Sequence, residues 1–427
     1  MGRLRSLGVA VAIATAWTGT IARAQEAKSA LPSPLTLEVV TKLARDDRSE
    51  IEAARQRTRA GWARANAEGK PPDPMLMTNL DHLPLPEVMG ADASFMIQQS
   101  IPLSGELGAR IRRAEWFARA LEEDEKTVRL DVELDAANAF LMLAEEQAMT
   151  AVVDKQIAVV ESLEKIIETR LSTGAGTPAD LLRAGLERSR LEVERDTLAR
   201  RIKASDAMLD AALGRNPNAE VPVCELPSPG PEPVDGAALA RTALAERPEL
   251  TSMRKRVRAA EEDVEVMRNM RAPMGVFGLG AAYTMTDGFG LMATVGISIP
   301  IWEDKYDSAI DEAKAMASME RAEVRAMQTM VSGAVVAARE RVEAAREREL
   351  AIRKKLIPLG DQVLKALLTS YTSGQTSVVA VIDGYQSVQM IEMEHVSARA
   401  ELGRARAQLA RKVGTGGGRT GSAPASD

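Results

Sequence analysis

Apolar positions repeat along most of the chain with the spacing of amphipathic helices. The stretch 109–173 lacks glycine and proline, and within it Ala137, Phe140, Leu141 and Ala144 share one helical face. A continuous helix over that stretch would be roughly 100 Å long at about 1.5 Å per residue. Because such helices need partners along their apolar stripe, we expect them to pack side by side. The returning stretch has coiled-coil-like steps of seven and four at Leu191, Leu198, Ile202, Leu209 and Leu213.

Between the helical stretches the pattern changes to alternation, which predicts strands. Residues 276–285 and 292–300 alternate apolar side chains with small or polar ones. In the first half of the chain we expect strands at 75–80 and 94–101, joined by a loop that contains DHLPLPEVMGAD. One apolar face and one small or polar face is typical of a half-buried strand, and also of a barrel wall between lipid and water.

The second half of the chain repeats the plan of the first. Pairs of segments correspond at offsets of 198 to 200: Pro74-Met75 with Pro273-Met274, Ile101-Pro102-Leu103 with Ile299-Pro300-Ile301, Thr173-Gly174 with Ser373-Gly374, and Leu213-Gly214 with Val413-Gly414. Each half has the order helix, two short strands, long helix, turn, long helix. We therefore predict a mainly α fold with a small β part and duplicated helical hairpins. The repeats are expected at 25–214 and 237–414, with a proline-rich connector at 215–236 and a disordered tail at 415–427.

The N-terminus has the pattern of an export signal. Arg3 and Arg5 precede a short apolar segment, and a small-x-small cleavage site ends at Ala24, so residues 1–24 are predicted to be a signal peptide. Removing these two arginines and Arg23 changes the formal net charge from -6 to -9. No basic patch stands out, which argues against nucleic-acid binding. The single cysteine, Cys224, excludes an internal disulfide and is expected to be a small linker residue rather than a reactive one.

Composition narrows the architecture further. Aromatic residues make up 3% of the chain and charged residues 27%, which suits long helices. Beyond residue 24 no run of 18 apolar residues occurs, so no transmembrane helix is predicted. Four short strands form a poor soluble sheet because its edges stay open, and they are too few to close a barrel. Several chains that pool their strands would remove every edge, so the pattern favours an oligomer.

Several segments carry a resemblance to a known family. They are the strand start PPDPMLMTNL, the strand-to-helix passages SFMIQQSIPLSGELGARIRRAE and LMATVGISIPIWEDKYDSAIDEAKA, and the turns TRLSTGAGTPADLLRAGLERSR and SYTSGQTSVVAVIDGYQSVQ. Pro102 and Pro300 precede the long helices in the two passages. With the duplication and the order of elements, these segments resemble the TolC-like outer-membrane efflux proteins over about residues 36–414. The segments DPMLM and SIPLSGELGAR are most similar to the branch that works with heavy-metal cation pumps.

The resemblance implies a homotrimer in the outer membrane of a Gram-negative bacterium. Each chain would give four strands to a shared twelve-stranded transmembrane β-barrel, and its helices would form a coiled-coil barrel, a tunnel through the periplasm. The lower end would meet a periplasmic adaptor, or membrane fusion protein, and an inner-membrane pump of the resistance-nodulation-division type. Such a protein is a passive conduit for heavy-metal cations, drugs or other small molecules, and it is neither an enzyme nor a cofactor-binding protein.

The resemblance also implies which residues lie at the periplasmic gate. Carboxylates near the second turn constrict the tunnel in family members, and Asp383 falls on one such position while Ala380 falls on the other. Asp180 falls on the position that ties neighbouring helices in relatives, and its usual basic partner falls on Thr376. Three Asp383 side chains near a three-fold axis would repel one another and attract cations. The alternative for Asp180 and Asp383 is a solvated helix face.

The turns themselves need particular residues. Gly174 and Gly374 are expected to adopt positive φ between antiparallel helices. Thr177 is expected to cap the returning helix, with Asp180 three residues later and Pro178 in the first turn. Because an adaptor would dock at these tips, the candidate docking residues are Gly174, Thr177, Gly374 and Thr376.

Metal or catalytic chemistry has little support. His82 and His395 lie far apart, and no CxxC or HxxxH pattern occurs. Met267, Met270 and Met274 have helical spacing that would suit a soft metal, but apolar filling is the expected role. Two other classes of protein stay open. A soluble periplasmic coiled-coil adaptor or scaffold would suit the hairpins but not the amphipathic strands, and an exported enzyme lacks any nucleophile-base arrangement.

Overall fold

The computed structural model describes residues 32–81, 92–216, 222–230 and 235–416. These residues form two compact units. The sheet unit consists of Glu50–Arg129 and Ala240–Ala334. The hairpin unit consists of the described residues up to Ser49, Leu130–Leu239 and the described residues from Val335 onward. The predicted signal peptide, His82 and nearly all of the predicted tail lie outside the described residues.

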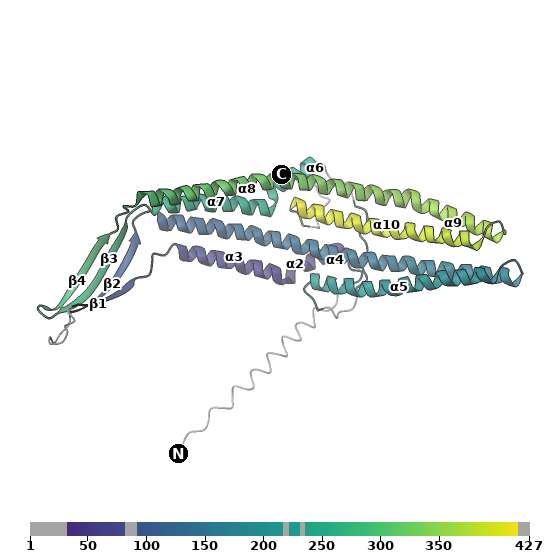
Figure 1. Cartoon of the computed structure of the whole chain (residues 1–427), viewed down its shortest axis with the longest axis horizontal. Helices are drawn as coiled ribbons and strands as arrows, with labels where there is room; N and C mark the ends of the chain where they lie inside the picture. Colours follow the sequence, from purple (N-terminus) through teal and green to yellow (C-terminus); the bar gives the residue numbers. More distant parts are fainter. Residues whose placement is uncertain (1–31, 82–91, 217–221, 231–234, 417–427) are drawn as a thin grey trace, which may run out of the picture. The chain divides into compact units, whose positions relative to one another are not determined.

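The sheet unit contains one antiparallel sheet with the strand order β1-β2-β3-β4 (Figure 1). Its strands are β1 Met75–Asp81, β2 Asp92–Pro102, β3 Met274–Thr284 and β4 Gly288–Ile297. All four predicted strands are present, but the expectation that the last one reaches Pro300 is wrong. The N–H of Ser298 donates to the carbonyl oxygen of Met274, the first residue of β3, at 2.9 Å. Because β3 offers no partner beyond that point, the ladder ends there.

The register gives the sheet one apolar face. Ile97 of β2 pairs with Leu76 of β1 and with Leu279 of β3, and Leu279 pairs in turn with Ala293 of β4. Paired residues project to the same side, and residues two positions along each strand join them. We call this surface the apolar sheet face. Its exposed large side chains are Leu76, Leu80, Phe95, Ile97, Ile101, Phe277, Leu279, Tyr283, Phe289, Leu291, Val295 and Ile297.

The other side of the sheet carries mainly small and polar side chains on β2, β3 and β4, together with methionines such as Met75 and Met77 of β1. Gln98, Gly278 and Thr294 are paired across β2, β3 and β4. A Cβ atom on Gly280 would lie 2.1 Å from the carbonyl oxygen of Phe95, so only glycine fits this position. The alternation read from the sequence therefore separates the two faces of the sheet as expected.

Four helices accompany the strands in the sheet unit: α3 Ser49–Glu68, α7 Pro248–Asn269, and the first parts of α4 Glu106–Ser172 and α8 Glu303–Ala351. Val264 of α7 packs with Ala313 and Ala317 of α8. Arg113 of α4 joins its neighbours by contacting Asp263 at 2.6 Å and Glu68 at 3.4 Å. The short helix α6 spans Gly236–Glu246.

The hairpin unit contains two long antiparallel helix pairs and the short helix α2 Leu37–Asp47 (Figure 1). The first pair is α4 with α5 Pro178–Ala212, and the second is α9 Ile357–Thr372 with α10 Val378–Val413. Leu191 and Leu198 of α5 are buried against Val153, Ile157 and Val160 of α4. The predicted coiled-coil spacing is confirmed by these contacts.

Helix α8 continues into the second hairpin through a short π-helical segment, Ile352–Leu356. Pro358 lies in the first turn of α9, directly after this segment, where the missing N–H of proline interrupts the regular helical ladder. Helix α8 runs through Gly333 without a break. None of the helices in the described part of the chain combines the length and apolarity needed to cross a membrane.

Candidate functional site at the hairpin tips

The first hairpin turns at Gly174, which has φ 73°. Its N–H donates to the carbonyl oxygen of Leu171 at 3.1 Å, and the N–H of Ala175 donates to that of Arg170 at 2.8 Å. This pair of bonds is the Schellman ending of a helix. A Cβ atom on Gly174 would have no neighbour within 4 Å. The backbone conformation, and not space, therefore requires glycine here.

The second hairpin makes the same turn at Gly374, which has φ 79°. Its N–H donates to the carbonyl oxygen of Tyr371 at 3.0 Å, and the N–H of Gln375 donates to that of Ser370 at 2.8 Å. Both predictions of positive φ are confirmed. The same conformation returns at Gly214 and Gly414, where α5 and α10 end with φ 67° and 92°.

Both returning helices begin at a hydroxyl cap. Thr177 Oγ1 accepts the N–H of Asp180 at 3.3 Å, and Asp180 Oδ2 accepts the N–H of Thr177 at 3.2 Å. This is a complete capping box with Pro178 in the first turn of α5, and it confirms the predicted cap. In the second hairpin Ser377 caps α10 by accepting the N–H of Ala380 at 3.4 Å.

The residues expected at the gate lie on the two returning helices. Asp180 is half-buried in the first turn of α5, and its carboxylate is engaged in the capping box. Asp383 is exposed in the second turn of α10, where its carbonyl oxygen accepts the hydroxyl of Ser387. Thr376 is half-buried in the turn before α10. Among the described residues, Asp180 and Asp383 have no hydrogen-bond partner and no basic partner in common.

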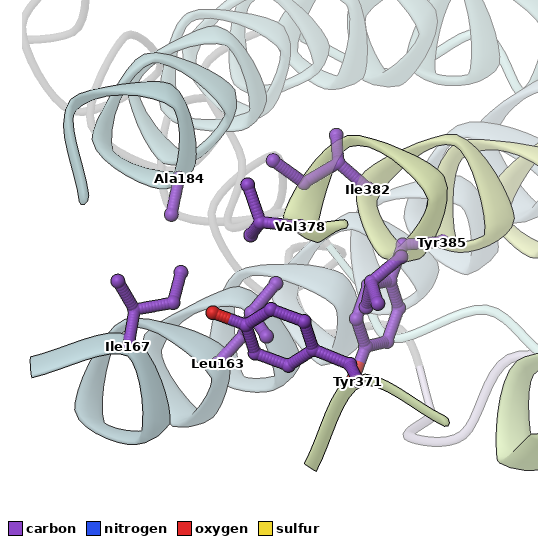
Figure 2. Packing of buried hydrophobic residues seen from close by; sticks show 8 residues of the cluster. Leu163, Ile167, Ala184, Tyr371, Val378, Ile382 and Tyr385 are labelled. Atoms are coloured by element: carbon purple, nitrogen blue, oxygen red, sulfur yellow. The ribbon is translucent and has the colours of Figure 1, made fainter. Parts of the chain in front are cut away.

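A hydrophobic cluster lies beneath the tips and joins both hairpins. It is formed by Leu163 and Ile167 of α4, Ala184 of α5, Tyr371 of α9, and Val378, Val381, Ile382 and Tyr385 of α10. In Figure 2 the ring of Tyr371 lies among Leu163, Ile167 and Val378. Because all four helices contribute, the two tips share one core.

Arg170 and Tyr371 are the tip residues that the sequence analysis missed. The Arg170 guanidinium lies 4.7 Å from the centre of the Tyr371 ring and donates to carbonyl oxygens of both turns. Burial raises the pKa of Tyr371, with the Arg170 charge opposing this shift and the Asp180 charge adding to it. Two sequence features could have indicated them. Arg170 is a basic residue in the last turn of α4, and Tyr371 is one of only 4 tyrosines in the chain.

The two strand-to-helix passages belong to the sheet unit. Pro102 is the last residue of β2, and Ser104 then connects two elements, since its hydroxyl donates to the Asn269 carbonyl oxygen at 3.0 Å and accepts the N–H of Glu106 at 3.3 Å. Pro300 is half-buried between β4 and α8. Pro102 thus marks a passage that is tied to the end of α7.

The residues considered for metal binding do not form a ligand set. Met267, Met270 and Met274 line one cavity of about 240 Å³ together with Lys305 and with Arg110, which forms an ion pair with Glu106 in the same lining. His395 Nε2 lies 3.3 Å from Glu349 Oε1, which also contacts Arg353 Nε at 3.0 Å. Among the described residues, no three His, Cys, Asp or Glu side chains could hold a metal ion.

Cys224 lies in the connector and is poorly suited to a nucleophilic role. Its N–H donates to Gln147 Oε1 at 2.8 Å, which attaches the connector to α4. Burial, aided by the charge of Asp206, raises the pKa of the Cys224 thiol to about 12. A thiol with that pKa stays protonated near neutral pH, and the thiolate is the nucleophilic form.

Comparison with known proteins shows which proteins the chain resembles. Residues 239–415 match the family described as outer membrane efflux protein. The outer membrane efflux protein BepC of Brucella suis biovar 1 (strain 1330) is 23% identical over 277 residues, which are 62% of this chain and 59% of BepC. Residues 239–415 of the chain are therefore similar to the outer membrane efflux proteins. The alignment with BepC spans less than two thirds of that relative's length.

Several solved structures share the fold of this chain. The outer-membrane channel OprN has a TM-score of 0.75 at 16% identity, with 89% of this chain and 90% of OprN covered. VceC of Vibrio cholerae has a TM-score of 0.72 at 17% identity, covering 89% and 96%. CusC has a TM-score of 0.76 at 13% identity, covering 89% and 92%. At these identities the three structures show that the chain shares their fold.

Proposed function

We propose that the chain is the outer-membrane exit duct of a tripartite efflux system and acts as a homotrimer that extends into the periplasm. The apolar sheet face carries this proposal. Leu76, Leu279 and Leu291 of that face are exposed by 70%, 73% and 87%. Large aliphatic side chains exposed over four neighbouring strands are unfavourable in water and suit contact with lipid.

Trimer formation follows from the sheet edges. β1 and β4 are edge strands of the four-stranded sheet, and β1 is exposed along its whole length. An edge in lipid leaves backbone N–H and C=O groups without partners, which costs several kcal/mol for each group. Three copies that pair β1 with a neighbouring β4 would close a barrel of twelve strands and remove this cost.

The partners follow from the hairpin tips. A periplasmic adaptor would dock on the turns around Gly174, Thr177, Gly374 and Thr376, and an inner-membrane pump of the resistance-nodulation-division type would supply the energy. Asp383 would form a carboxylate ring at the mouth, and Asp180 would lie beside it. The chain itself catalyses nothing in this scheme, and the pump selects the cargo, with heavy-metal cations and small organic molecules as the two candidate classes.

Two single variants test whether the apolar sheet face contacts lipid. Each places one positive charge on β4, on opposite sides of the sheet. Leu291→Arg puts a cation on the apolar sheet face, where an arginine near the bilayer midplane costs about 2–4 kcal/mol. Thr294→Arg puts the same charge on the opposite side of the same strand. We expect Leu291→Arg to abolish recovery of trimer from outer-membrane fractions on unheated gels, and Thr294→Arg to retain it.

Two results would contradict the proposal. Equal recovery of membrane trimer for both variants would show that the apolar sheet face does not meet lipid. A wild-type chain recovered as a monomer without detergent would favour a soluble periplasmic adaptor or scaffold instead.

A further inference from the structure

One side chain, Arg170, occupies the ends of two helices from different hairpins. Its Nη2 donates to the carbonyl oxygen of Ala175 in its own turn at 3.2 Å. Its Nη1 donates to the carbonyl oxygens of Tyr371 and, at 3.4 Å, Thr372, which form the last turn of α9. Residues 170 and 371 are 201 positions apart in the sequence. Arg170 therefore bridges the first tip to the second.

The chemistry of helix ends explains why a guanidinium fits here. The last four carbonyl groups of a helix lack intrahelical partners, and the end carries a partial negative charge. The planar guanidinium has several N–H donors and can bind carbonyl oxygens at two helix ends at once. The ammonium group of a lysine is less suited to this geometry. The guanidinium also lies on the ring of Tyr371, which is only 3% exposed. The contact is thus partly shielded from water, where hydrogen bonds from a charged donor are stronger.

The bridge is one-sided although the turns are duplicated. Ser370 occupies the place in the second hairpin that Arg170 occupies in the first, since the carbonyl oxygen of each accepts the N–H of the residue five positions later in its turn. Thr376 carries no charge, and the carboxylate of Asp180 is engaged in its own capping box. A Cβ atom on Gly374 would lie 3.7 Å from Arg170 Nη2, so the guanidinium approaches the second turn itself.

Other polar links between the hairpins lie farther from the turns. Gln386 of α10 donates to Glu187 of α5 at 2.8 Å, and Gln389 donates to Glu194 at 3.1 Å. These links do not involve Arg170. Loss of the Arg170 contacts would remove the hydrogen bonds between the two turns, while the hydrophobic cluster and the links between α5 and α10 remain.

We propose that Arg170 is an intrachain clasp that holds the two hairpin tips of each chain together, so that movement of the second tip requires release of its guanidinium. The proposal rests on the proposed function for its consequence, because the tips would surround the mouth of the duct. Arg170 is a positioning residue in this scheme and touches no cargo.

Hydrogen exchange of the purified full-length chain in detergent tests the clasp. In Arg170→Ala, we expect the amides of the second tip, around Gly374 and Gln375, to exchange at least about tenfold faster, the factor for losing one hydrogen bond from a charged donor. A role confined to the end of α4 would change exchange in the first tip alone. The response of the second tip is therefore the decisive readout.

Three variants serve as controls. Arg200→Ala removes a positive charge from an exposed site on α5 and should leave both tips unchanged. Tyr371→Phe removes a buried hydroxyl that has no hydrogen-bond partner among the described residues, and keeps the ring under the guanidinium. It should also leave exchange unchanged. Arg170→Lys keeps the charge without the fork and should accelerate exchange to an intermediate degree, and it carries the test if the alanine variant does not fold.

Unchanged exchange in the second tip of Arg170→Ala and Arg170→Lys would overturn the clasp. Single-channel recording in a planar bilayer tests its consequence, and Arg170→Ala should show higher conductance or more frequent opening than the wild type and Arg200→Ala. A wild-type chain that conducts nothing would overturn the proposed function, whereas the exchange result would still decide the clasp.

Discussion

Two buried carboxylates lie one turn apart near the end of α5, and both differ from the solvated charges around them. Asp206 is 5% exposed and Asp210 is 1% exposed. Burial, reinforced by the Asp210 charge and opposed by Arg215, raises the pKa of Asp206. Burial also raises the pKa of Asp210, against the attraction of Arg215, whose Nε lies 3.7 Å from Asp210 Oδ1. Both groups therefore favour protonation in the folded state more than in the unfolded one.

The sign of the resulting pH dependence follows directly. A carboxyl group whose pKa is raised by folding stabilises the fold below its unfolded pKa, and this stability is lost as the pH rises through the folded value. We expect Asp206→Asn to raise the free energy of unfolding at pH 7 by on the order of 1 kcal/mol, because it removes a buried charge. Thermal unfolding followed by circular dichroism should show this gain shrinking toward pH 4. Asp196→Asn, at a side chain that is 80% exposed on the same helix, should change little. A larger gain at pH 4 than at pH 7 would contradict the prediction.

Single residues were predictable from the sequence where their role is local. The cap at Thr177 and the positive φ at Gly174 depend on neighbours within four positions, so their sequence patterns indicated them. Arg170 bonds to a carbonyl 201 positions away, and no local pattern reports such a partner. The burial of Asp206 was missed for the same reason, since a charged residue on a helix is usually solvated.

At the scale of elements, two glycines with open space around them differ in whether their backbone conformation tolerates another residue. Gly174 has positive φ, whereas Gly333 lies inside α8, and a Cβ atom on either would meet nothing within 4 Å. Gly174→Ala should destabilise the chain by about 1–2 kcal/mol, the cost of the left-handed conformation for an L-residue. Gly333→Ala should stabilise it by about 0.5–1 kcal/mol, because alanine loses less backbone freedom in a helix.

Gly174→Ala and Gly333→Ala add the same methyl group. Opposite changes in the free energy of unfolding would therefore report the difference in backbone conformation between the two positions. Gly174→Asn provides a further control, since asparagine tolerates this conformation better than alanine and should cost less. Thermal midpoints of the three variants in one detergent check the ranking. Destabilisation by both alanine variants would show that space at Gly333, and not conformation, decides the outcome.

Element types were predictable, and element ends were less so. Alternation of apolar with small or polar side chains indicated β3 and β4, and the duplicated plan of the chain placed β1 and β2 at the corresponding positions of the first half. The end of β4 at Ile297 depends on where β3 begins, which the sequence of β4 does not contain. Helix α8 continues through Gly333 because Val331 and Val335 on either side are buried by 99% and 100% of their surface, and tertiary packing outweighs the local cost of glycine.

At the scale of the whole molecule, the sequence indicated features that a single chain cannot display. The open edges of a four-stranded sheet indicated an oligomer before any relative was considered, and they are present at β1 and β4. The repeat boundaries at 25–214 and 237–414 stay a prediction. They describe the duplicated order of elements, whereas the two compact units each combine segments from both halves of the chain. Duplication and compactness thus divide the chain differently, because the long helices α4 and α8 contribute to both units.

The proposed gate is the feature that depends most on assembly. Asp383 is exposed in one chain, but three copies near a three-fold axis would form a ring of negative charge that attracts cations. Asp383→Asn should lower the preference for cations over anions in planar-bilayer recordings. The effect should be largest in about 0.1 M salt, where charges act over about 10 Å, and small in 1 M salt, where the range is about 3 Å. Asp196→Asn makes the same charge change elsewhere on a hairpin and should leave selectivity unaltered. Equal selectivity of wild type and Asp383→Asn at low salt would place Asp383 on a solvated helix face outside the conduction path, and the carboxylate ring would have to be sought at another position of the tips.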